Sequence, residues 1–306
     1  MILYTMDQIN ENYKTQAGYV AIIGRPNVGK STLLNKILGQ KVSITSRKPQ
    51  TTRHKILGIK TQGDAQAIYV DTPGIHGKNE KMLNQYMNQA ALSTFTDVDL
   101  IVFVVAGTIW NQEDEAVLQA LQKTNRPVIL AINKTDIVEQ KDKLLEHIKN
   151  ISQKFNFAMI IPISAQSGTN IAKLEEVVGT FLPKSPWYFP QEQFTDRDSK
   201  FLISEIIREK LMRFLGQELP YAISVMVDQI EDKEGIVNVN TTIYVEREGQ
   251  KIIIVGKNGE VLKKVGTLAR KEIENLFNKK VFLRLWVKVK SSWTDNRELL
   301  QQLGYN

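Results

Sequence analysis

A segment from Gly24 to Ser31, GRPNVGKS, has the residue types and spacing that phosphate binding requires. It fits the pattern G-x-x-x-x-G-K-S, whose glycines let backbone N–H groups surround phosphate oxygens. In such loops the lysine reaches the β and γ oxygens of a nucleoside triphosphate, and the serine hydroxyl binds Mg²⁺. We therefore expect Lys30 to bind phosphate and Ser31 to bind a metal ion.

Two segments further along the chain supply candidates for completing a metal site. Asp71 to Gly74, DTPG, follows the apolar run AQAIYV. A carboxylate at this place holds Mg²⁺ through water, and a glycine N–H there senses the γ-phosphate. Between the two motifs, a basic polar loop contains the adjacent hydroxyls of Thr51 and Thr52. This loop is either a solvated surface segment or a switch that closes on the metal and opens after hydrolysis.

Two later motifs point to the base of the nucleotide. Asn133 to Asp136, NKTD, follows PVILAI and matches N-K-x-D. A carboxylate there accepts both the ring N–H and the exocyclic amine of guanine, a pairing that adenine does not offer. Ser164 to Gln166, SAQ, follows MIIPI and can close over the base with a backbone N–H. Each motif alone is also typical of a strand-end turn, but four in order favour a guanine-nucleotide site.

A sheet must position these motifs, because each of them follows an apolar run. From Gly18 to about Leu182, continuous apolar runs alternate with helical patterns. This alternation predicts an α/β fold with a mostly parallel sheet covered on both faces. Ligands of such sheets bind at the carboxyl ends of the strands, which is where the motifs fall.

A segment with Pro183, Pro186 and Pro190 ends the alternation, because proline disfavours both helix and sheet. We place a domain boundary there. An amphipathic helix pattern follows, and then two strand patterns, a glycine-bounded turn, a helix pattern through Phe277 and a last strand, KVFLRLWVKVK. In that strand we interpret Trp286 as packed rather than stacked on a base.

The turn from Gly256 to Gly259 has two possible interpretations. Asn-Gly between apolar runs is a hairpin signal, whereas two glycines three residues apart with a lysine between them can clamp a nucleic-acid backbone. Apolar residues after Gly259 recur at helical spacing, so we predict that the turn leads into a helix. Lys257 and Asn258 then stand at a helix N-terminus, where N–H groups and the helix dipole favour phosphate.

Composition excludes several classes of protein. The 306-residue chain contains no cysteine, which excludes disulfides, thiol catalysis and cysteine-based zinc sites. Its longest apolar run, 100–106, is too short to cross a membrane. The net charge is +7, and residues 251–290 hold eleven Lys or Arg against three Glu. This excess around the glycine-bounded turn indicates an anionic partner.

The nucleotide motifs resemble those of translation-factor-like GTPases, and the order helix, two strands, GxxG, helix, strand resembles a type II KH domain. With KPQTTRHKILGI in the candidate switch and PWYFPQEQFTDRDSKFLISEIIREKLMRFLGQELPYAISV at the junction, the chain resembles the Era family of bacterial ribosome-assembly GTPases. The resemblance implies an α/β P-loop GTPase domain over 1–182, a linker over 183–198 and an α+β type II KH domain that binds RNA over 199–306.

The resemblance also implies a function. It indicates a GTPase that uses GTP and GDP with Mg²⁺, and a monomer whose KH domain binds the 3′ end of 16S ribosomal RNA. That activity belongs to 16S rRNA processing and to the biogenesis of the small ribosomal subunit. The expected location is the cytoplasm, with peripheral contact to the cytoplasmic face of the inner membrane.

The resemblance assigns site residues by position, and it selects Thr52 over Thr51 as the switch ligand. The expected metal ligands are Ser31, Thr52 and Asp71, and the expected catalytic residues are Lys30, Thr52, Gly74 and Asn27. The nucleotide-binding positions are Gly24, Arg25, Pro26, Asn27, Val28, Gly29, Lys30, Ser31, Thr32, Asp71, Thr72, Pro73, Gly74, Ile75, Asn133, Lys134, Asp136, Ser164 and Ala165. The RNA-binding positions are Gly256, Lys257, Asn258, Gly259, Lys263 and Lys264.

One position departs from the pattern of Ras-like GTPases, which carry a water-orienting glutamine directly after the DxxG glycine. Here that residue is Ile75, whose side chain neither donates nor accepts a hydrogen bond. We therefore expect slow hydrolysis by the chain alone, or another means of aligning water. Asn27 resembles the asparagine with which some GTPases lacking this glutamine hold a potassium ion, so K⁺ is a candidate second cation.

Two functions of other classes compete with this hypothesis. One is a regulator at a membrane surface or in cell division, for which RNA binding is incidental. The other is a P-loop kinase of a small molecule, which the guanine-reading NKTD motif and the absence of an evident acceptor pocket disfavour.

Overall fold

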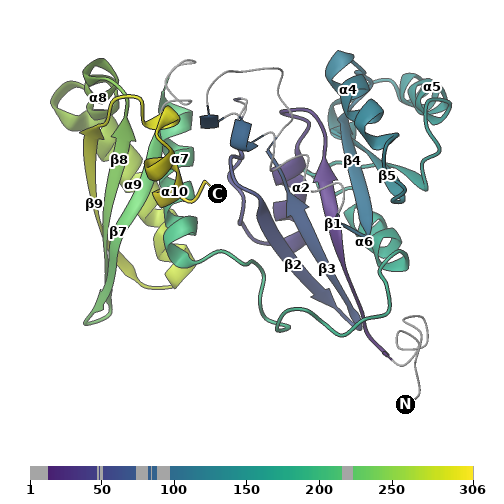
Figure 1. The fold of residues 1–306 in the computed structure, drawn as a ribbon, viewed down its shortest axis with the longest axis horizontal. Coiled ribbons are helices and arrows are strands. Elements are labelled where there is room, and N and C mark those ends of the chain that lie inside the picture. The colour runs from purple at the N-terminus through teal and green to yellow at the C-terminus, as the bar shows by residue number, and fades with distance from the viewer. Residues whose placement is uncertain are drawn as a thin grey trace. The chain divides into compact units, whose positions relative to one another are not determined.

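The protein is described from a computed structural model, which covers residues 13–46, 48, 51–73, 82–83, 85–87, 97–215 and 223–305 (Figure 1). The chain forms two compact units. The first consists of Met1–Ser43, Thr52–Gly77 and Met87–Asp196, and the second of Ile44–Thr51, Lys78–Tyr86 and Arg197–Asn306. No helix among the described residues is long and apolar enough to cross a membrane.

The first unit is built on a six-stranded sheet with the strand order β2-β3-β1-β4-β5-β6. All neighbouring pairs are parallel except β2 and β3, so the predicted mostly parallel sheet is confirmed. The strands are β1 (Gln16–Ile23), β2 (Ile56–Gln62), β3 (Ala65–Asp71), β4 (Leu100–Ala106), β5 (Val128–Asn133) and β6 (Met159–Pro162).

Helices connect the parallel strands and bury their apolar faces. Every residue of β4 is buried, as expected for a strand covered on both sides. Helices α4 and α5 pack on the sheet through a cluster that contains Val117, Leu121 and Ile151, whereas α2 and α6 contact β3 and each other. The helices of this unit are α2 (Lys30–Leu38), α4 (Gln112–Leu121), α5 (Lys141–Ser152) and α6 (Ile171–Thr180), with a 3₁₀ turn η1 (Thr135–Ile137).

The strand register brings the nucleotide motifs to one edge of the sheet. The phosphate-loop segment begins directly after β1, and Asp71 is the last residue of β3, where it lies opposite Ile22 of β1. Asn133 is the last residue of β5 and lies opposite Ala106 of β4. Because these strands are parallel, their carboxyl ends share an edge, the usual place for ligands in this architecture.

The proline-rich segment after Leu182 belongs to the first unit up to Asp196. The Ala17 N–H donates to the Pro183 carbonyl at 3.1 Å, and the side chain of Gln66 donates to the Phe189 carbonyl at 2.8 Å. These bonds fasten the segment along the sheet. The predicted boundaries of the domains and the linker stay a prediction.

The second unit has a three-stranded sheet, β7 (Ser224–Lys233), β8 (Ile236–Val245) and β9 (Lys280–Val289), in that order. The pair β7 and β8 is antiparallel, and the pair β8 and β9 is parallel. Helices α7 and α9 bury their apolar stripes against one face of it through Ile203, Ile207, Val265 and Ala269. The helices are α7 (Ser199–Phe214), α8 (Glu248–Val255), α9 (Glu260–Phe277) and α10 (Arg297–Gln302), with 3₁₀ turns η3 (Lys257–Gly259) and η4 (Trp293–Asp295).

Two expectations about this unit have clear outcomes. The turn at Gly256 to Gly259 leads into α9, so the predicted helix is confirmed and the hairpin reading is wrong. The prediction that Trp286 is packed is also wrong, because 47% of this residue is exposed. Strand β9 has one buried face and one open face, and Trp286 lies on the open one, with Phe282 and Arg284.

Candidate nucleotide and nucleic-acid sites

The phosphate loop requires glycine at two positions because of close approaches and backbone conformation. Gly24 has φ 149° and Gly29 has φ 104°, values in the region that disfavours residues with a side chain. A Cβ at Gly24 would lie 2.3 Å from the Val104 carbonyl oxygen, and one at Gly29 would lie 2.3 Å from Nδ2 of Asn133. The loop therefore closes tightly on β4 and on the NKTD motif, and α2 starts immediately after it.

Lys30 points back into the loop. It is buried, and its Nζ donates to the carbonyl oxygens of Gly24 at 2.8 Å and Arg25 at 3.0 Å. Burial lowers the pKa of Lys30 to about 8, and the nearby Asp71 carboxylate opposes this shift. A phosphate group would favour the charged form further, which is the electrostatic contribution that a phosphate-binding lysine makes.

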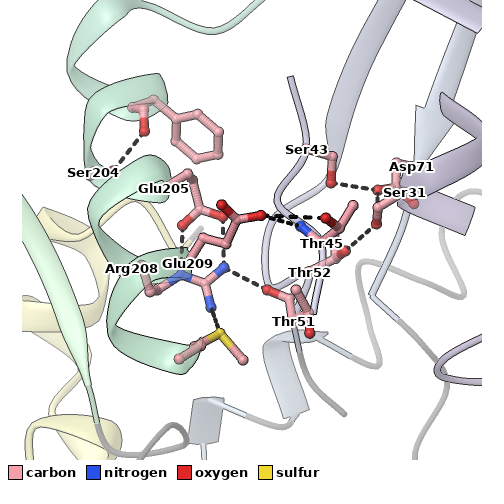
Figure 2. A network of polar contacts seen from close by, with 12 residues as sticks. Ser31, Ser43, Thr45, Thr51, Thr52, Asp71, Ser204, Glu205, Arg208 and Glu209 are labelled. Carbon is pink, nitrogen blue, oxygen red and sulfur yellow. Dashed lines mark hydrogen bonds and ion pairs between the residues drawn. The ribbon is translucent and has the colours of Figure 1, made fainter. Parts of the chain in front are cut away.

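The expected metal ligands lie together (Figure 2). The Ser31 hydroxyl donates to Oδ2 of Asp71 at 2.7 Å and lies 2.8 Å from the Thr52 hydroxyl. Ser43, which the sequence did not single out, donates to the same Oδ2 at 2.8 Å. Asp71 is fully buried, and its Oδ1 has no hydrogen-bond partner among the described residues.

This oxygen cluster fits a hard cation. Burial raises the pKa of Asp71, while Lys30 and the Ser31 and Ser43 hydroxyls lower it. Oδ1 of Asp71 is a buried carboxylate oxygen without a partner, which is costly, and the Ser31 and Ser43 hydroxyls bond to the other oxygen, Oδ2. Oxygen donors of this kind are what Mg²⁺ prefers. Ser31, Thr52 and Asp71 therefore form a set that could hold Mg²⁺, which would neutralise charge on the phosphates.

Asn133 joins three of the motifs. Its Nδ2 donates to the Val28 carbonyl of the phosphate loop at 2.8 Å, and its Oδ1 accepts from the Ala165 N–H at 2.9 Å. Only 2% of Asn133 is exposed. One side chain thus fixes the phosphate loop and the SAQ loop relative to the end of β5.

The remaining guanine-site residues lie at the same edge of the sheet. Oδ1 of Asp136 accepts from the Ser164 hydroxyl at 2.6 Å, and Asp136 is exposed. Nζ of Lys134 donates to the Asn27 carbonyl at 2.7 Å. An ionised carboxylate accepts several hydrogen bonds, so Asp136 keeps acceptor sites for the two N–H groups of a guanine edge.

An ion pair that the sequence did not indicate connects the phosphate loop to the start of α4. Nε of Arg25 lies 3.0 Å from Oδ2 of Asp114, which is fully buried. Asp114 also accepts from the Asn111 N–H and forms the capping box at the start of α4. The pattern N-x-x-D signals the cap, but nothing in the sequence pairs it with Arg25, eighty-nine positions away.

The other predicted nucleotide positions lie around these groups. Pro26 and Thr32 are half-buried, Asn27 is exposed with φ 63°, and Thr72 and Pro73 are buried. The predicted positions Gly74 and Ile75 lie outside the described residues.

The GKNG turn lies between α8 and α9. Gly256 ends α8 with φ 74°, Asn258 has φ 52°, and Gly259 has φ 77°. Lys257 and Asn258 are exposed directly before the first residue of α9. The positive end of the dipole of an eighteen-residue helix therefore coincides with a lysine.

A groove of about 410 Å³ continues from this turn between α9 and β9. Of the two predicted lysines, Lys263 lines the groove, and Lys264 is exposed outside it. Arg270 and Phe282 were missed. Arg270 follows Lys263 by seven residues, two helical turns, and this spacing alone places both on one face. The full lining is Gly259, Leu262, Lys263, Gly266, Thr267, Arg270, Phe282, Leu283 and Leu285.

Comparison with known proteins identifies the family. Residues 19–134 match the family described as 50S ribosome-binding GTPase, and residues 218–294 match the family described as KH domain. The chain is 56% identical over 293 residues to GTPase Era of Histophilus somni, covering 95% of this chain and 98% of that protein. The chain belongs to the Era family of GTPases. It is also 56% identical to GTPase Era of Haemophilus influenzae, over 95% of this chain and 97% of that protein.

Solved Era structures agree with this assignment. A variant of Aquifex aeolicus Era bound to GDP.AlF4⁻ superposes with a TM-score of 0.92 at 38% identity, over 95% of this chain and 99% of that one. The same values hold for Era in complex with MgGDPNP and nucleotides 1506–1542 of 16S ribosomal RNA. The predicted family, the α/β GTPase fold followed by a KH domain, and the GTPase activity are confirmed.

Proposed function

We propose that this GTPase binds the 3′ end of 16S ribosomal RNA through its KH domain and acts in 16S rRNA processing and small-subunit biogenesis. The main support is the exposed Lys257–Asn258 turn at the start of α9, next to a groove that Lys263 and Arg270 line. The Era relative bound to nucleotides 1506–1542 of that RNA supports the same partner.

The nucleotide site supports specific roles for its residues. Lys30 binds the β and γ phosphates, Asp136 reads guanine, and Ser31, Thr52 and Asp71 hold Mg²⁺ with the nucleotide. The Era relatives bound to GDP.AlF4⁻ and MgGDPNP support this chemistry. Water attacks the γ-phosphorus, the bond to the β-γ bridging oxygen breaks, and GDP and phosphate leave.

We include K⁺ as a second cation near Asn27. Asn27 is exposed in the phosphate loop, where a cation would add positive charge to the one that Lys30 provides. Comparing GTP turnover in KCl and NaCl tests this assignment, with Asn27→Ala as the variant that loses any preference for K⁺. Equal turnover in the two salts would refute it.

Peripheral contact with the cytoplasmic face of the inner membrane is a further part of the proposal. Its support is the basic surface of the second unit, because anionic lipids attract such surfaces. Sedimentation with vesicles of anionic lipid, with and without competing RNA, tests it. Displacement by RNA would show that the same basic surface serves both ligands.

The RNA proposal is tested with a double charge reversal, Lys257→Glu with Lys263→Glu. We expect the affinity for an RNA of the 16S 3′-end sequence to fall by about a hundredfold or more, because two phosphate contacts become repulsive. GTP turnover without RNA should persist. Lys264→Glu adds the same charge outside the groove and should cost far less, and equal losses for Lys263→Glu and Lys264→Glu would reject the groove as the binding site.

A further inference from the structure

Ser43 is fully buried beside the expected metal ligands but is not one of them. It lies in the loop after α2, and its hydroxyl donates to Oδ2 of Asp71 at 2.8 Å (Figure 2). Ser31, which is an expected metal ligand, donates to the same oxygen at 2.7 Å. All three residues belong to the first compact unit.

The two oxygens of Asp71 have different surroundings. Oδ2 accepts from both serine hydroxyls, whereas Oδ1 is buried and has no hydrogen-bond partner among the described residues. Two donors on one oxygen set the rotation of the carboxylate plane and leave the other oxygen available to a ligand. Mg²⁺ is usually held through one or two carboxylates, so a buried carboxylate oxygen that is kept available suits this ion.

The backbone of Ser43 is fixed by Asn35, a residue of α2. Nδ2 of Asn35 donates to the Ser43 carbonyl at 2.7 Å, and its Oδ1 accepts from the N–H groups of Val42 and Ser43, both at 3.0 Å. These bonds do not involve the Ser43 hydroxyl, so removing the hydroxyl leaves the loop in place. Because Ser31 is expected to bind the metal ion as well as Asp71, Ser43 is the donor whose position does not depend on the ion.

We propose that Ser43 is a positioning residue for the Mg²⁺ site, and that its hydroxyl orients Asp71 so that Oδ1 is available to the metal ion. Hydrogen-bond partners of metal ligands commonly act in this way. The inference rests on the proposed role of Asp71 as a metal ligand. It predicts an effect that depends on Mg²⁺, whereas a hydroxyl that only stabilises the fold would affect nucleotide binding equally with and without the metal ion.

The test follows the binding of fluorescent GDP to the full chain, in EDTA and at increasing Mg²⁺ concentration. In Ser43→Ala we expect the midpoint of the Mg²⁺ titration to rise about tenfold, the smaller effect typical of losing a partner of a metal ligand, because the Ser31 donor remains. The dissociation constant of GDP in EDTA should not change. Ser43→Cys replaces the hydroxyl with a weak donor and should also raise the midpoint, so the test does not depend on one variant.

Thr15→Ala is the matched control. The Thr15 hydroxyl donates to the Ser185 carbonyl at 2.8 Å, but Thr15 directly precedes β1, at the edge of the sheet opposite the nucleotide motifs. This variant should leave the Mg²⁺ midpoint unchanged. A similar rise in this control, an unchanged midpoint in both Ser43 variants, or an equal loss of GDP affinity in Mg²⁺ and in EDTA would overturn the positioning role.

Asp71→Asn separates the possible failures. If Asp71→Asn leaves the Mg²⁺ midpoint unchanged, the proposed role of Asp71 is wrong and the inference falls with it. If Asp71→Asn raises the midpoint but the Ser43 variants do not, only the positioning role is overturned. In the Asp71→Asn background, Ser43→Ala should cause no further rise, and an additional rise of the same size would also overturn the inference.

Discussion

Replacing Asn133 by alanine removes a side chain that joins three parts of the nucleotide site. The substitution deletes the donor to the Val28 carbonyl and the acceptor of the Ala165 N–H, both buried. The two backbone groups are then left without a partner in the interior. Each unpaired buried group costs about 1–3 kcal/mol, and entry of water from the open edge recovers part of this.

We therefore expect the free energy of unfolding of the first unit to fall by about 3 kcal/mol in Asn133→Ala. The phosphate loop and the SAQ loop also lose their common anchor, so nucleotide binding must order them. GDP affinity should drop by roughly tenfold or more, because the free energy needed to order the two loops reduces the net free energy of binding.

Hydrogen exchange of the β5 amides gives the free energy of opening of this unit, and titration with fluorescent GDP gives the affinity. The matched control is Asn35→Ala. Asn35 also donates to a carbonyl, that of Ser43 at 2.7 Å, and accepts from the Val42 and Ser43 N–H groups, but it does not join the phosphate and SAQ loops. If both variants lost stability and GDP affinity equally, the reasoning about Asn133 as a common anchor would be refuted.

Three further changes test separate parts of the site. Asp136→Asn should weaken GTP binding by about a hundredfold, since two bonds to a charged acceptor are lost, and should favour xanthine nucleotides; unchanged guanine affinity in a titration would contradict the assignment. Because burial raises the pKa of Asp71 and a protonated carboxyl is a poor Mg²⁺ ligand, Mg²⁺-dependent GTP affinity should decline, as the pH falls, at a higher pH than an ordinary aspartate would give. Asp71→Asn should show no such decline. Arg25→Gln leaves the buried Asp114 without a counter-ion and should cost about 3 kcal/mol of stability, most of which the added Asp114→Asn should restore in denaturant unfolding; no recovery would show that the ion pair is not the cause.

The sequence predicted the structural features that depend on residues close together in the chain. The phosphate-loop glycines, the position of Asp71 at the end of β3 and the helix after Gly259 all follow from spacing within about ten residues. Parallel strands then bring the motifs to one edge by a general rule, so the arrangement of the nucleotide site was accessible without a structure.

Contacts between residues far apart in the sequence could not be predicted from local patterns. Ser43 reaches Asp71 across twenty-eight positions, and Arg208 reaches Thr51 across one hundred and fifty-seven. Their residue types are common, so only the folded geometry identifies them. The prediction for Trp286 was wrong for another reason. Alternation shows that a side chain lies on one of the two faces of a strand, but which face is covered depends on the helices that pack there.

The open face of β9 also affects how copies of this protein meet one another. Among the described strands, β9 pairs only with β8, so no described strand covers its other edge, which offers a place for a second strand. One backbone group of β9, the Val281 N–H, instead donates to Oε1 of Glu274 at 3.2 Å. Phe282 and Trp286, 49% and 47% exposed, add apolar surface there, and Lys280, Arg284 and Lys288 alternate with them. Two such edges repel each other, whereas an RNA backbone does not repel either one. The positive charges therefore disfavour pairing of two β9 edges but still allow a polyanion to bind there. Neutral substitutions at Lys280, Arg284 and Lys288 should produce concentration-dependent aggregation.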